Sequence, residues 1–413
     1  MALDYERSNS VMQSLLLADA FLPHAGGSRV YYYHLYRDWA PDRVTVLTKE
    51  IPGWQEFDRR ESKECFRIIR RFKPLDTTRY GELPKAALPM VQALVRAMFW
   101  PVDVVACGDL FPPGPIAMLL KRTFGLPYLV HCHGDDFLQA GRYRQQLRLR
   151  NSIYRSADMV IANSEFTRQL LLESGIPDYR IRKITPGVNC AEFAPVPSDH
   201  GLVERLTLQG VRVLLTVARL VPRKGHDMVL RAVAKLGGEF PGLKYLIVGD
   251  GPEETKLRQL AGELGISERV TFAGFVPQDQ LPDYYRLCDV MVMPNREQAG
   301  DKEGFGMTFL EASAAGKPAI GGRSGGASEA VSDGVTGLIV EPTDLDQLTA
   351  AIRTLLLQPR MAEAMGAAGL QRARTQFDWK LRSAELHSIV RELAAQAEYR
   401  RNGVGKTQSR QRH

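Results

Sequence analysis

The amino-acid sequence predicts an α/β protein with two doubly wound domains that face each other across a cleft. Short apolar runs alternate with longer amphipathic stretches along most of the chain, a pattern typical of βαβ units around a parallel sheet. The apolar runs fall into two sets, each about the size of one domain. A polar segment with two prolines, residues 195–201, separates the sets. Because ligands of such sheets lie outside the carboxyl ends of the strands, we expect the binding site at the cleft.

The predicted strands are short runs rich in Val, Ile, Leu and Ala. In the first set they are Ser14–Ala18, Val44–Leu47, Val102–Ala106, Tyr128–Cys132 and Met159–Ala162. In the second set they are Val211–Val217, Tyr245–Val248, Val270–Phe272, Val290–Met293 and Leu338–Val340. The amphipathic stretches of the second half predict helices at Gly225–Leu236, Glu253–Leu264, Leu345–Leu357 and Met361–Gln376.

Four parts are expected along the chain. Residues 1–195 form the first doubly wound domain, and residues 196–377 form the second. Residues 378–399 are helical in pattern, and we expect this helix to pack back on the first domain. Residues 400–413 are basic and contain Gly and Gln, so we expect a disordered tail.

The composition is that of an ordinary globular protein. Hydrophobic residues make up 44% of the 413 residues, and the formal net charge of +7 suits an anionic substrate or an acidic membrane face without indicating nucleic acid. The five cysteines form no CxxC pair, which favours a reducing compartment, and Asp4 and Glu6 ahead of the apolar run Leu15–Ala18 argue against a signal peptide. The most apolar helix candidate, Ala86–Trp100, contains Arg96 and is too short to span a membrane. We expect a cytoplasmic protein, at most peripheral on the inner face of the cell membrane.

The strongest motif is the segment from Glu303 to Glu311, in which two acids bracket a glycine loop that opens a helix. Unpaired main-chain N–H groups and the helix dipole at such a position favour an anion such as a diphosphate. Glu311 would then accept hydrogen bonds from ribose hydroxyls, and Glu303 would bind hydroxyls of the group that the diphosphate carries. For either glutamate alone, a helix-stabilising charge or a surface acid is the favoured interpretation.

Two cations, Arg219 and Lys224, follow the predicted strand Val211–Val217 and precede a helix. At the carboxyl end of a strand they are placed to neutralise a departing diphosphate without a metal. We expect Arg223, between them, to be solvated. An isolated Arg/Lys pair is usually surface charge, but this pair lies where parallel sheets bind their ligands.

In combination, these motifs resemble the retaining glycosyltransferases of family 4, which have the GT-B fold of two Rossmann-like domains. The resemblance spans nearly the whole chain and is densest over residues 211–342. Its motifs are Arg219, Lys224-Gly225, Gly249-Asp250-Gly251-Pro252, Gly274-Phe275-Val276, Glu303 to Glu311, Gly325-Gly326, and Gly334 with Gly337. Within the family, Met293-Pro294, Glu303–Gly306 and Gly321–Gly326 are most similar to the bacterial subgroup that includes phosphatidylinositol mannosyltransferases.

The resemblance implies a role for each motif residue. It implies that catalysis depends on His133, Arg219, Lys224 and Glu303. It implies that Gly27, Gly274, Phe275, Val276, Phe305, Gly306, Met307, Thr308 and Glu311 bind the donor. His133 ends a predicted strand and would face the donor sugar from the first domain, and ordinary packing is the alternative for it. The second domain would bind the nucleotide sugar and the first the acceptor.

The implied reaction moves a hexosyl group, with retention, from a GDP- or UDP-sugar to a hydroxyl acceptor, a membrane lipid or a growing glycan. No cofactor is expected, and no metal, because no second pair of ligands stands near His131 and His133 in the sequence. Two basic groups, within residues 59–73 and 142–155, are expected to hold the first domain on an anionic membrane. A solvated basic helix is the alternative interpretation of these charges.

Other functions fit the same diphosphate pocket. They are a nucleotide-sugar epimerase, a phosphorylase of the same fold, and a non-enzymatic sugar-nucleotide binder. A phosphorylase would carry a cofactor lysine in a longer chain, and no RNA-binding module is recognised that would indicate nucleic acid as a partner. Pro277-Gln278 follows Val276 where an acid would point to guanine, so the base of the donor stays open.

Overall fold

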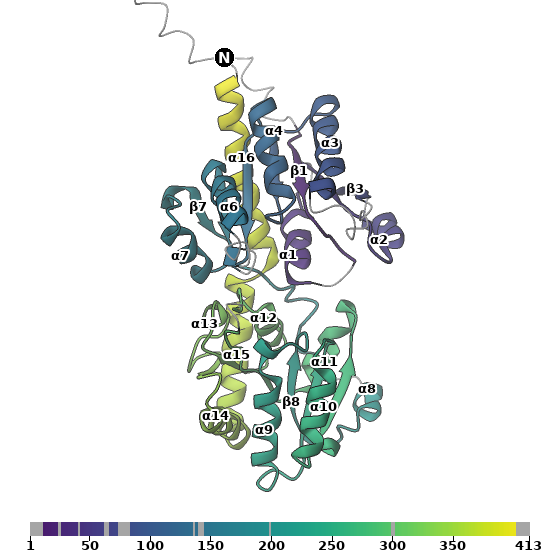
Figure 1. The fold of residues 1–413 in the computed structure, drawn as a ribbon. Coiled ribbons are helices and arrows are strands. Elements are labelled where there is room, and N and C mark those ends of the chain that lie inside the picture. The colour runs from purple at the N-terminus through teal and green to yellow at the C-terminus, as the bar shows by residue number, and fades with distance from the viewer. Residues whose placement is uncertain are drawn as a thin grey trace, which may run out of the picture. The chain divides into compact units, whose positions relative to one another are not determined.

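The computed structural model of the protein describes residues 11–23, 26–39, 42–61, 66–72, 83–134, 137–138, 144–197, 200–298 and 302–401 (Figure 1). They form two compact units. Unit 1 contains the described residues up to Asn163, residues Thr167–Ile184 and those from Lys380 on, and unit 2 contains Ser164–Phe166 and Thr185–Trp379. The main division lies between Ile184 and Thr185, whereas the sequence places the boundary near residue 195. Val188 already forms a parallel bridge with Asp378 inside unit 2.

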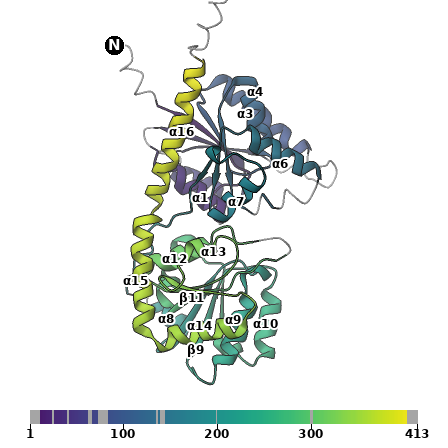
Figure 2. The same cartoon turned by 90° about the vertical axis from the view of Figure 1, so that its left-hand side faces the viewer.

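Unit 1 is built on a parallel sheet of seven strands in the order β3-β2-β1-β4-β5-β6-β7. The strands are β1 Gln13–Leu17, β2 Arg43–Lys49, β3 Phe66–Phe72, β4 Val104–Cys107, β5 Tyr128–Cys132, β6 Met159–Ala162 and β7 Ile181–Lys183. Its helices are α1 Gly27–Tyr36, α2 Trp54–Glu61, α3 Leu83–Phe99, α4 Pro113–Phe124, α6 Arg144–Ser156, most of α7 Glu165–Glu173, and α16 Trp379–Arg401. Figure 2 shows this sheet between α16 on one side and α3, α4 and α6 on the other.

Unit 2 is built on a parallel sheet of six strands in the order β10-β9-β8-β11-β12-β13. The strands are β8 Arg212–Val217, β9 Leu243–Val248, β10 Val270–Gly274, β11 Val290–Met293, β12 Ala319–Gly322 and β13 Gly337–Val340. The helices are α8 His200–Arg205, α9 His226–Leu236, α10 Glu254–Glu263, α11 Leu281–Leu287, α12 Met307–Ala314, α13 Ala327–Ala330, α14 Leu345–Leu357 and α15 Pro359–Gln376. In both sheets the strand order reverses beside the first strand, where doubly wound sheets bind their ligands.

Strand β8 shows why these apolar runs form buried strands. Val213, Leu215 and Val217 belong to the hydrophobic cluster on one face of the sheet, and Leu214 belongs to the cluster on the other. Successive side chains of a strand point to opposite faces, so a run that is apolar throughout is stable only when both faces are covered. Strand β8 pairs in parallel with β9 and β11, which places its carboxyl end beside theirs at one edge.

Every strand that the sequence predicts is present: β5, β6 and β11 have the predicted ends, and the others differ slightly at one or both ends. The described part of the chain contains three further strands. Strand β3 lies in the first basic segment, so the alternative of a solvated basic helix is wrong for residues 66–72. Strand β12 has the sequence Ala-Ile-Gly-Gly, which contains too few residues of high β-propensity to be predicted as a strand. Strand β7 has only three residues.

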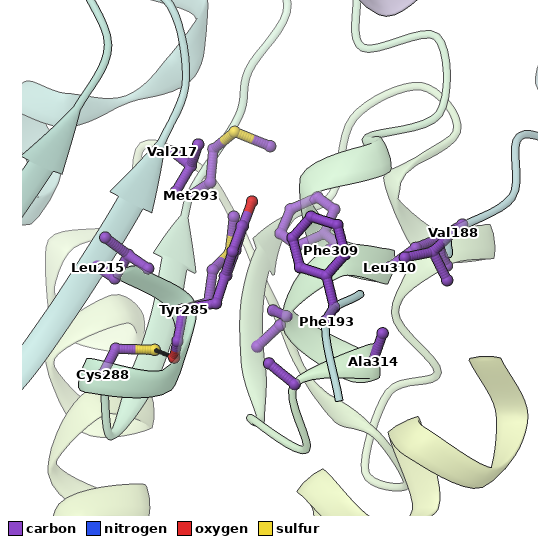
Figure 3. Close-up of a cluster of buried hydrophobic side chains, with 14 of the residues drawn as sticks. Val188, Phe193, Leu215, Val217, Tyr285, Cys288, Met293, Phe309, Leu310 and Ala314 are labelled. Atoms are coloured by element: carbon purple, nitrogen blue, oxygen red, sulfur yellow. Dashed lines mark hydrogen bonds between the residues drawn. The ribbon is translucent and has the colours of Figure 1, made fainter. Parts of the chain in front are cut away.

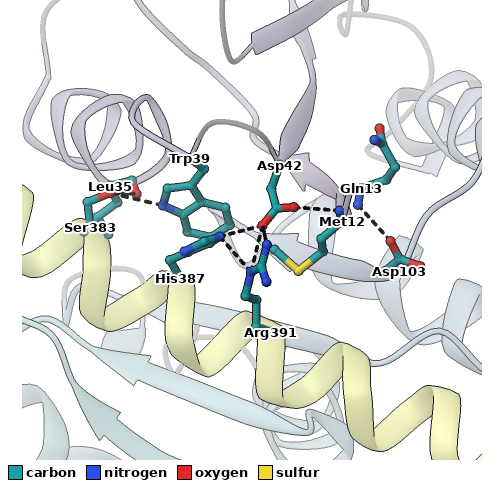
Figure 4. A network of polar contacts seen from close by, with 9 residues as sticks. All are labelled: Met12, Gln13, Leu35, Trp39, Asp42, Asp103, Ser383, His387 and Arg391. Carbon is teal, nitrogen blue, oxygen red and sulfur yellow. Dashed lines mark hydrogen bonds and ion pairs between the residues drawn. The ribbon is translucent and has the colours of Figure 1, made fainter. Parts of the chain in front are cut away.

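Helix α16 packs on unit 1 through a group of polar contacts around Asp42 (Figure 4). The buried carboxylate of Asp42 accepts hydrogen bonds from the main-chain N–H of Met12 (2.7 Å) and from Arg391 (2.6 Å), and it lies 2.7 Å from Nε2 of His387. One turn away, the indole of Trp39 donates to Ser383 (3.1 Å). The helix runs to Arg401, so Arg400 and Arg401 are helical, and the remainder of the predicted tail lies outside the described residues.

Candidate functional site

A turn at the carboxyl end of β8 carries the two predicted cations. After Arg219 the chain forms a 3₁₀ turn, η3 Pro222–Lys224, and Gly225 follows with φ of +75°. A Cβ on Gly225 would lie 2.4 Å from the main-chain oxygen of Pro294, which follows β11. Only glycine therefore lets this turn lie against the end of β11, which explains why Gly225 follows Lys224.

The turn places Lys224 and Arg223 on Glu303. The ammonium of Lys224 lies 2.5 Å from Oε2 of Glu303, and Nη1 of Arg223 lies 2.9 Å from the same oxygen. All three side chains are largely buried, with exposed fractions of 12% for Lys224, 18% for Arg223 and 10% for Glu303. Burial raises the pKa of Glu303, but the ammonium of Lys224 and the guanidinium of Arg223 lower it further, so the net shift is below the ordinary value. Glu303 is therefore a carboxylate held between two cations.

This arrangement changes one expectation about the turn. The sequence predicts a solvated Arg223. In the structure its side chain is instead largely buried and paired with Glu303. The 3₁₀ turn places consecutive residues close together, so both Arg223 and Lys224 reach one carboxylate. Arg219 is exposed, and among the described residues no side chain pairs with its guanidinium.

The predicted glycine loop does open a helix. Gly306 precedes α12 with φ of +91°, and its carbonyl accepts a hydrogen bond from the N–H of Phe309 (3.0 Å). A Cβ on Gly306 would lie 2.6 Å from the ring of Phe309. Phe305 is buried in the hydrophobic cluster of the sheet.

A second glycine loop supports the turn at Glu303. The N–H of Gly326 donates to the carbonyl of Glu303 (2.9 Å), and a Cβ on Gly325 would lie 2.0 Å from that oxygen. Within the described residues, the buried hydroxyl oxygens of Thr308 and Ser324 have no hydrogen-bond partner. Buried hydroxyls without partners are costly, so Thr308, in the first turn of α12, is a candidate group for binding a ligand.

Glu311 lies in α12 and is buried. Its Oε2 accepts a hydrogen bond of 2.6 Å from the hydroxyl of Tyr285 in α11. Burial raises the pKa of Glu311, and the hydrogen bonds from Tyr285 and Gln278 lower it, with a net shift above the ordinary value. Figure 3 shows Tyr285 beside Phe309 and Met293 in the hydrophobic cluster. Tyr285 was not identified from the sequence, because a tyrosine on a short helix gives no signal of the carboxylate that it meets.

The predicted base pocket lies at the ends of β9 and β10. Gly274 ends β10 with φ of +69°, and its carbonyl accepts a hydrogen bond from the N–H of Gly249 (2.8 Å). Phe275 is exposed and Val276 is buried. The loop thus has both a main-chain surface and an apolar side chain at the edge of the sheet, beside the end of β9.

Gly27 and His133 belong to unit 1, and the other predicted site residues belong to unit 2. Gly27 is the first residue of α1, at the end of the loop that follows β1. His133 follows β5 directly, and its ring lies against those of Tyr31 and Tyr32, with centroid distances of 5.1 and 5.4 Å. The two units therefore each carry a predicted site region at the carboxyl edge of their own sheet.

Among the residues that the structure describes, no three His, Cys, Asp or Glu side chains come together as a metal site. None of the described helices combines the length and the apolar character that crossing a membrane requires. The cysteines Cys107, Cys132, Cys190 and Cys288 are buried thiols.

Comparison with known proteins gives two family matches that follow one another along the chain. Residues 26–187 match the family described as "Glycosyl transferase 4-like domain", and residues 204–372 match "Glycosyl transferases group 1". The first match lies mostly in unit 1 and the second in unit 2.

Individual relatives agree with these matches. The chain is 33% identical over 384 residues to a GDP-mannose-dependent α-(1-6)-phosphatidylinositol monomannoside mannosyltransferase of Mycolicibacterium smegmatis, covering 91% of this chain and 97% of the relative. It is 30% identical over 339 residues to a D-inositol 3-phosphate glycosyltransferase of Streptosporangium roseum, with 76% of each chain covered. Among solved structures, HepE of Anabaena in complex with UDP has a TM-score of 0.77 at 22% identity, covering 92% of this chain and all of that one.

Proposed function

Because the chain belongs to the group 1 glycosyl transferases of family 4 and has the GT-B fold, we propose that it transfers a mannosyl group from GDP-mannose, with retention, to a phosphatidylinositol-type acceptor. The donor and the acceptor are those that the name of the Mycolicibacterium relative gives. A UDP-sugar is the second candidate donor, because HepE was solved with UDP and the sequence after Val276 does not select guanine.

The observation that supports this proposal is the buried cluster of Lys224, Arg223 and Glu303 beside the first turn of α12. Two cations in a largely buried position need a nearby anion, and Glu303 supplies only one negative charge. A diphosphate at the start of α12 would supply the remaining charge and would accept hydrogen bonds from the free N–H groups of the helix and from Thr308. Arg219, at the end of the same strand, would add a third cation.

The same groups would act in the chemical step. As the glycosyl bond breaks, negative charge accumulates on the departing diphosphate and positive charge on the sugar carbon. Lys224, Arg219 and the N–H groups at the start of α12 would stabilise the diphosphate, which is the work a divalent cation does in other enzymes, so we propose a mechanism without a metal. Glu303 would bind donor-sugar hydroxyls and Glu311 the ribose. We name no carboxylate nucleophile, and the departing phosphate would take the proton of the acceptor.

A donor panel tests this proposal. We expect GDP-mannose to raise the melting temperature more than UDP- and ADP-sugars do, and to be hydrolysed slowly without acceptor. Lys224→Ala should lower the rate of transfer by about a hundredfold or more, the typical cost of removing one preorganised charge-stabilising group. Arg212→Ala removes a cation from the opposite end of β8, where it pairs with Asp289 at the surface, and serves as the matched control. Equal rates for the two variants would contradict the proposed role of the turn.

We further propose that unit 1 docks on the cytoplasmic face of an anionic membrane through the end of α3. Several apolar side chains are exposed there, and because they follow one another at intervals of four and three residues, they lie on one face of the helix. The residues of this surface are Val91, Val95, Met98, Phe99 and Trp100. The guanidinium of Arg67 lies over the ring of Trp100, 5.8 Å from its centroid, and adds positive charge beside the surface. Apolar side chains with adjacent cations are typical of proteins that lie on anionic lipid.

The sequence predicts that two basic groups, within residues 59–73 and 142–155, hold unit 1 on a membrane, but part of these groups is buried. Arg70 is buried and binds Asp58 at 2.9 Å, and Arg150 is buried, donates to the carbonyl of Phe137 (2.8 Å) and lies over its ring. Neither is available to a lipid headgroup. Lys63, Lys73 and Arg142 lie outside the described residues.

Sedimentation with vesicles tests the docking proposal. We expect the protein to sediment with phosphatidylserine-containing vesicles at low salt and not with neutral phosphatidylcholine vesicles. Replacing both Met98 and Phe99 by Ser should abolish sedimentation, whereas Tyr179→Ser, which removes an exposed aromatic elsewhere on unit 1, should not. Equal recovery with neutral vesicles, or equal loss in both variants, would contradict it.

A further inference from the structure

The buried carboxyl group of Glu311 is held by hydrogen bonds from two neighbouring elements of unit 2. The hydroxyl of Tyr285, in α11, donates to Oε2 of Glu311 at 2.6 Å. The side chain of Gln278, in the 3₁₀ turn η5 Gln278–Gln280, also forms a hydrogen bond with this carboxyl group. Glu311 is 9% exposed and Tyr285 is fully buried. Because a buried carboxyl group is costly unless it is hydrogen-bonded, both contacts stabilise it.

The packing of Tyr285 fixes the direction of its hydroxyl. Its ring lies in the hydrophobic cluster with Phe309 and Met293 (Figure 3), and it meets the ring of Phe193 at a centroid distance of 5.6 Å. Within the described residues, this hydroxyl has one hydrogen-bond partner, the carboxyl group of Glu311. The closely packed ring therefore presents its single proton to one oxygen of Glu311.

Glu311 has neighbours at both regions that are proposed to bind the ends of a nucleoside diphosphate. Thr308 precedes it by three residues in α12, so the two side chains lie on one face of the helix, and Thr308 is in the first turn, where the diphosphate is proposed to bind. Gln278 follows the predicted base pocket, which ends at Val276, by two residues. The ribose of a nucleoside diphosphate joins its base to its diphosphate. A ribose would therefore lie beside the carboxyl group of Glu311.

The carboxyl group of Glu311 has capacity for a ribose beyond its two hydrogen bonds within the protein. An ionised carboxyl group has about four acceptor positions, and Tyr285 and Gln278 use two of them. Burial raises the pKa of Glu311 and the nearby charge of Glu192 adds to this, whereas the hydrogen bonds from Tyr285 and Gln278 lower it. The two contacts thus favour the ionised form, which can accept from both hydroxyls of a ribose.

We propose that Tyr285 is a positioning residue that aims the carboxylate of Glu311 at the ribose hydroxyls of the donor nucleotide, with Gln278 as the second donor to that carboxylate. This inference rests on the proposed function, in which Glu311 binds the ribose. Tyr285 acts through Glu311 and does not touch the nucleotide. Loss of its hydroxyl therefore weakens the contacts that the ribose hydroxyls make and leaves those of the base and the diphosphate intact.

Binding of nucleotides with and without ribose hydroxyls tests this proposal. The probes are GDP and dideoxy-GDP, which lacks both ribose hydroxyls, or the matching uridine pair if the donor panel selects UDP. In titration calorimetry we expect the natural protein to bind GDP about tenfold more tightly than dideoxy-GDP, because hydrogen bonds to a charged group are lost in the analogue. Tyr285→Phe removes one oxygen and keeps the ring. We expect this variant to bind GDP about tenfold more weakly than the natural protein does, with the affinity for dideoxy-GDP unchanged.

The matched control is Tyr128→Phe in unit 1. Tyr128 is also fully buried, and its hydroxyl likewise forms a hydrogen bond of 2.6 Å, to the carbonyl of Ile153. We expect this variant to bind both nucleotides as the natural protein does. The proposal is overturned if Tyr285→Phe weakens GDP and dideoxy-GDP equally, as a purely structural role would, or if it weakens neither. It is also overturned if Tyr128→Phe loses the preference for GDP to the same extent.

A second variant covers the case in which Tyr285→Phe does not fold. Gln278 is only partly buried and lies in a short turn, so Gln278→Ala removes the other hydrogen bond to Glu311 with less effect on the core, and we expect the same loss confined to GDP. If the natural protein binds neither GDP nor UDP, the proposed function fails and this inference fails with it. If it binds one of them but shows no preference for the ribose hydroxyls, or if neither variant changes that preference, the inference alone fails.

Discussion

At the scale of single residues, burial changes the protonation of side chains that support the site as well as those within it. His226 begins α9 and is buried, with Nδ1 3.1 Å from the hydroxyl of Tyr245 and Nε2 3.3 Å from the carbonyl of Arg219. Burial lowers the pKa of His226 to about 4. The folded protein therefore binds this proton less readily than the unfolded chain does. The stability that neutral His226 contributes is fully present above pH 6.5 and is lost as the pH falls toward 4.

We expect the free energy of unfolding to depend less on pH between 7 and 4 in His226→Gln than in the natural protein. The difference between the two curves should approach about 3 kcal/mol at the acidic end. Urea unfolding at several pH values measures it. Parallel curves for the two proteins would show that His226 binds its proton as readily in the folded protein as in the unfolded chain.

The residues of the site differ in how far sequence could identify them. Lys224 and Glu303 could be predicted to work together, because one follows a strand and the other opens a glycine loop at the same sheet edge. The pairing of Arg223 with Glu303 could not be predicted, because it depends on a single 3₁₀ turn. The contact of Tyr285 with Glu311 could not be predicted either, since only the tertiary fold brings the two residues together.

At the scale of elements, the start of α12 depends on the missing side chain of Gly306. Gly306 has φ of +91°, and an added Cβ would lie 2.6 Å from the ring of Phe309. We expect Gly306→Ala to lower the free energy of unfolding by several kcal/mol, because it combines backbone strain with overpacking. Gly265→Ala is the control: Gly265 has φ of +66° with open space around it, so only strain of about 1 kcal/mol is expected. Urea unfolding compares the two, and an equal loss would mean that the contact with Phe309 is relieved without cost.

Elements were predictable where their pattern is local. Alternation of apolar runs with amphipathic stretches located β5, β6 and α14 to the residue. This pattern did not predict β12, because two of the four residues of the strand are glycines. Close packing requires a glycine there, since a Cβ on Gly322 would lie 2.1 Å from the carbonyl oxygen of Asn295. The pattern missed β3 because charged residues interrupt the run, and one of them, Arg70, is buried by its bond to Asp58.

At the scale of the whole molecule, unit 1 is assembled from segments that are far apart in the chain. Asp42 is one polar link between its N-terminal part and α16, through His387 and Arg391. We expect Asp42→Asn to lower the free energy of unfolding by about 2 kcal/mol, because hydrogen bonds to a charged group are lost. Proteolytic cleavage within α16 should also become faster.

The control for this prediction is Asp346→Asn, which removes a carboxylate from an exposed ion pair with Lys235 and should have no measurable effect. Stability and proteolysis unchanged in Asp42→Asn would mean that apolar packing alone holds α16.

The two doubly wound domains could be predicted from the sequence. Their division at Ile184 could not, because it is set by the tertiary contact of Val188 with Asp378.

The return of α16 to unit 1 has a consequence for how the protein is made. A ribosome delivers nearly all of unit 2, from Thr185 to Trp379, before it delivers the helix that unit 1 needs. Until Arg391 has emerged, the nascent first unit lacks a complete set of partners for Asp42 from α16. Domains generally fold as units in the order of their synthesis, but here the domain that begins the chain is the last to be completed.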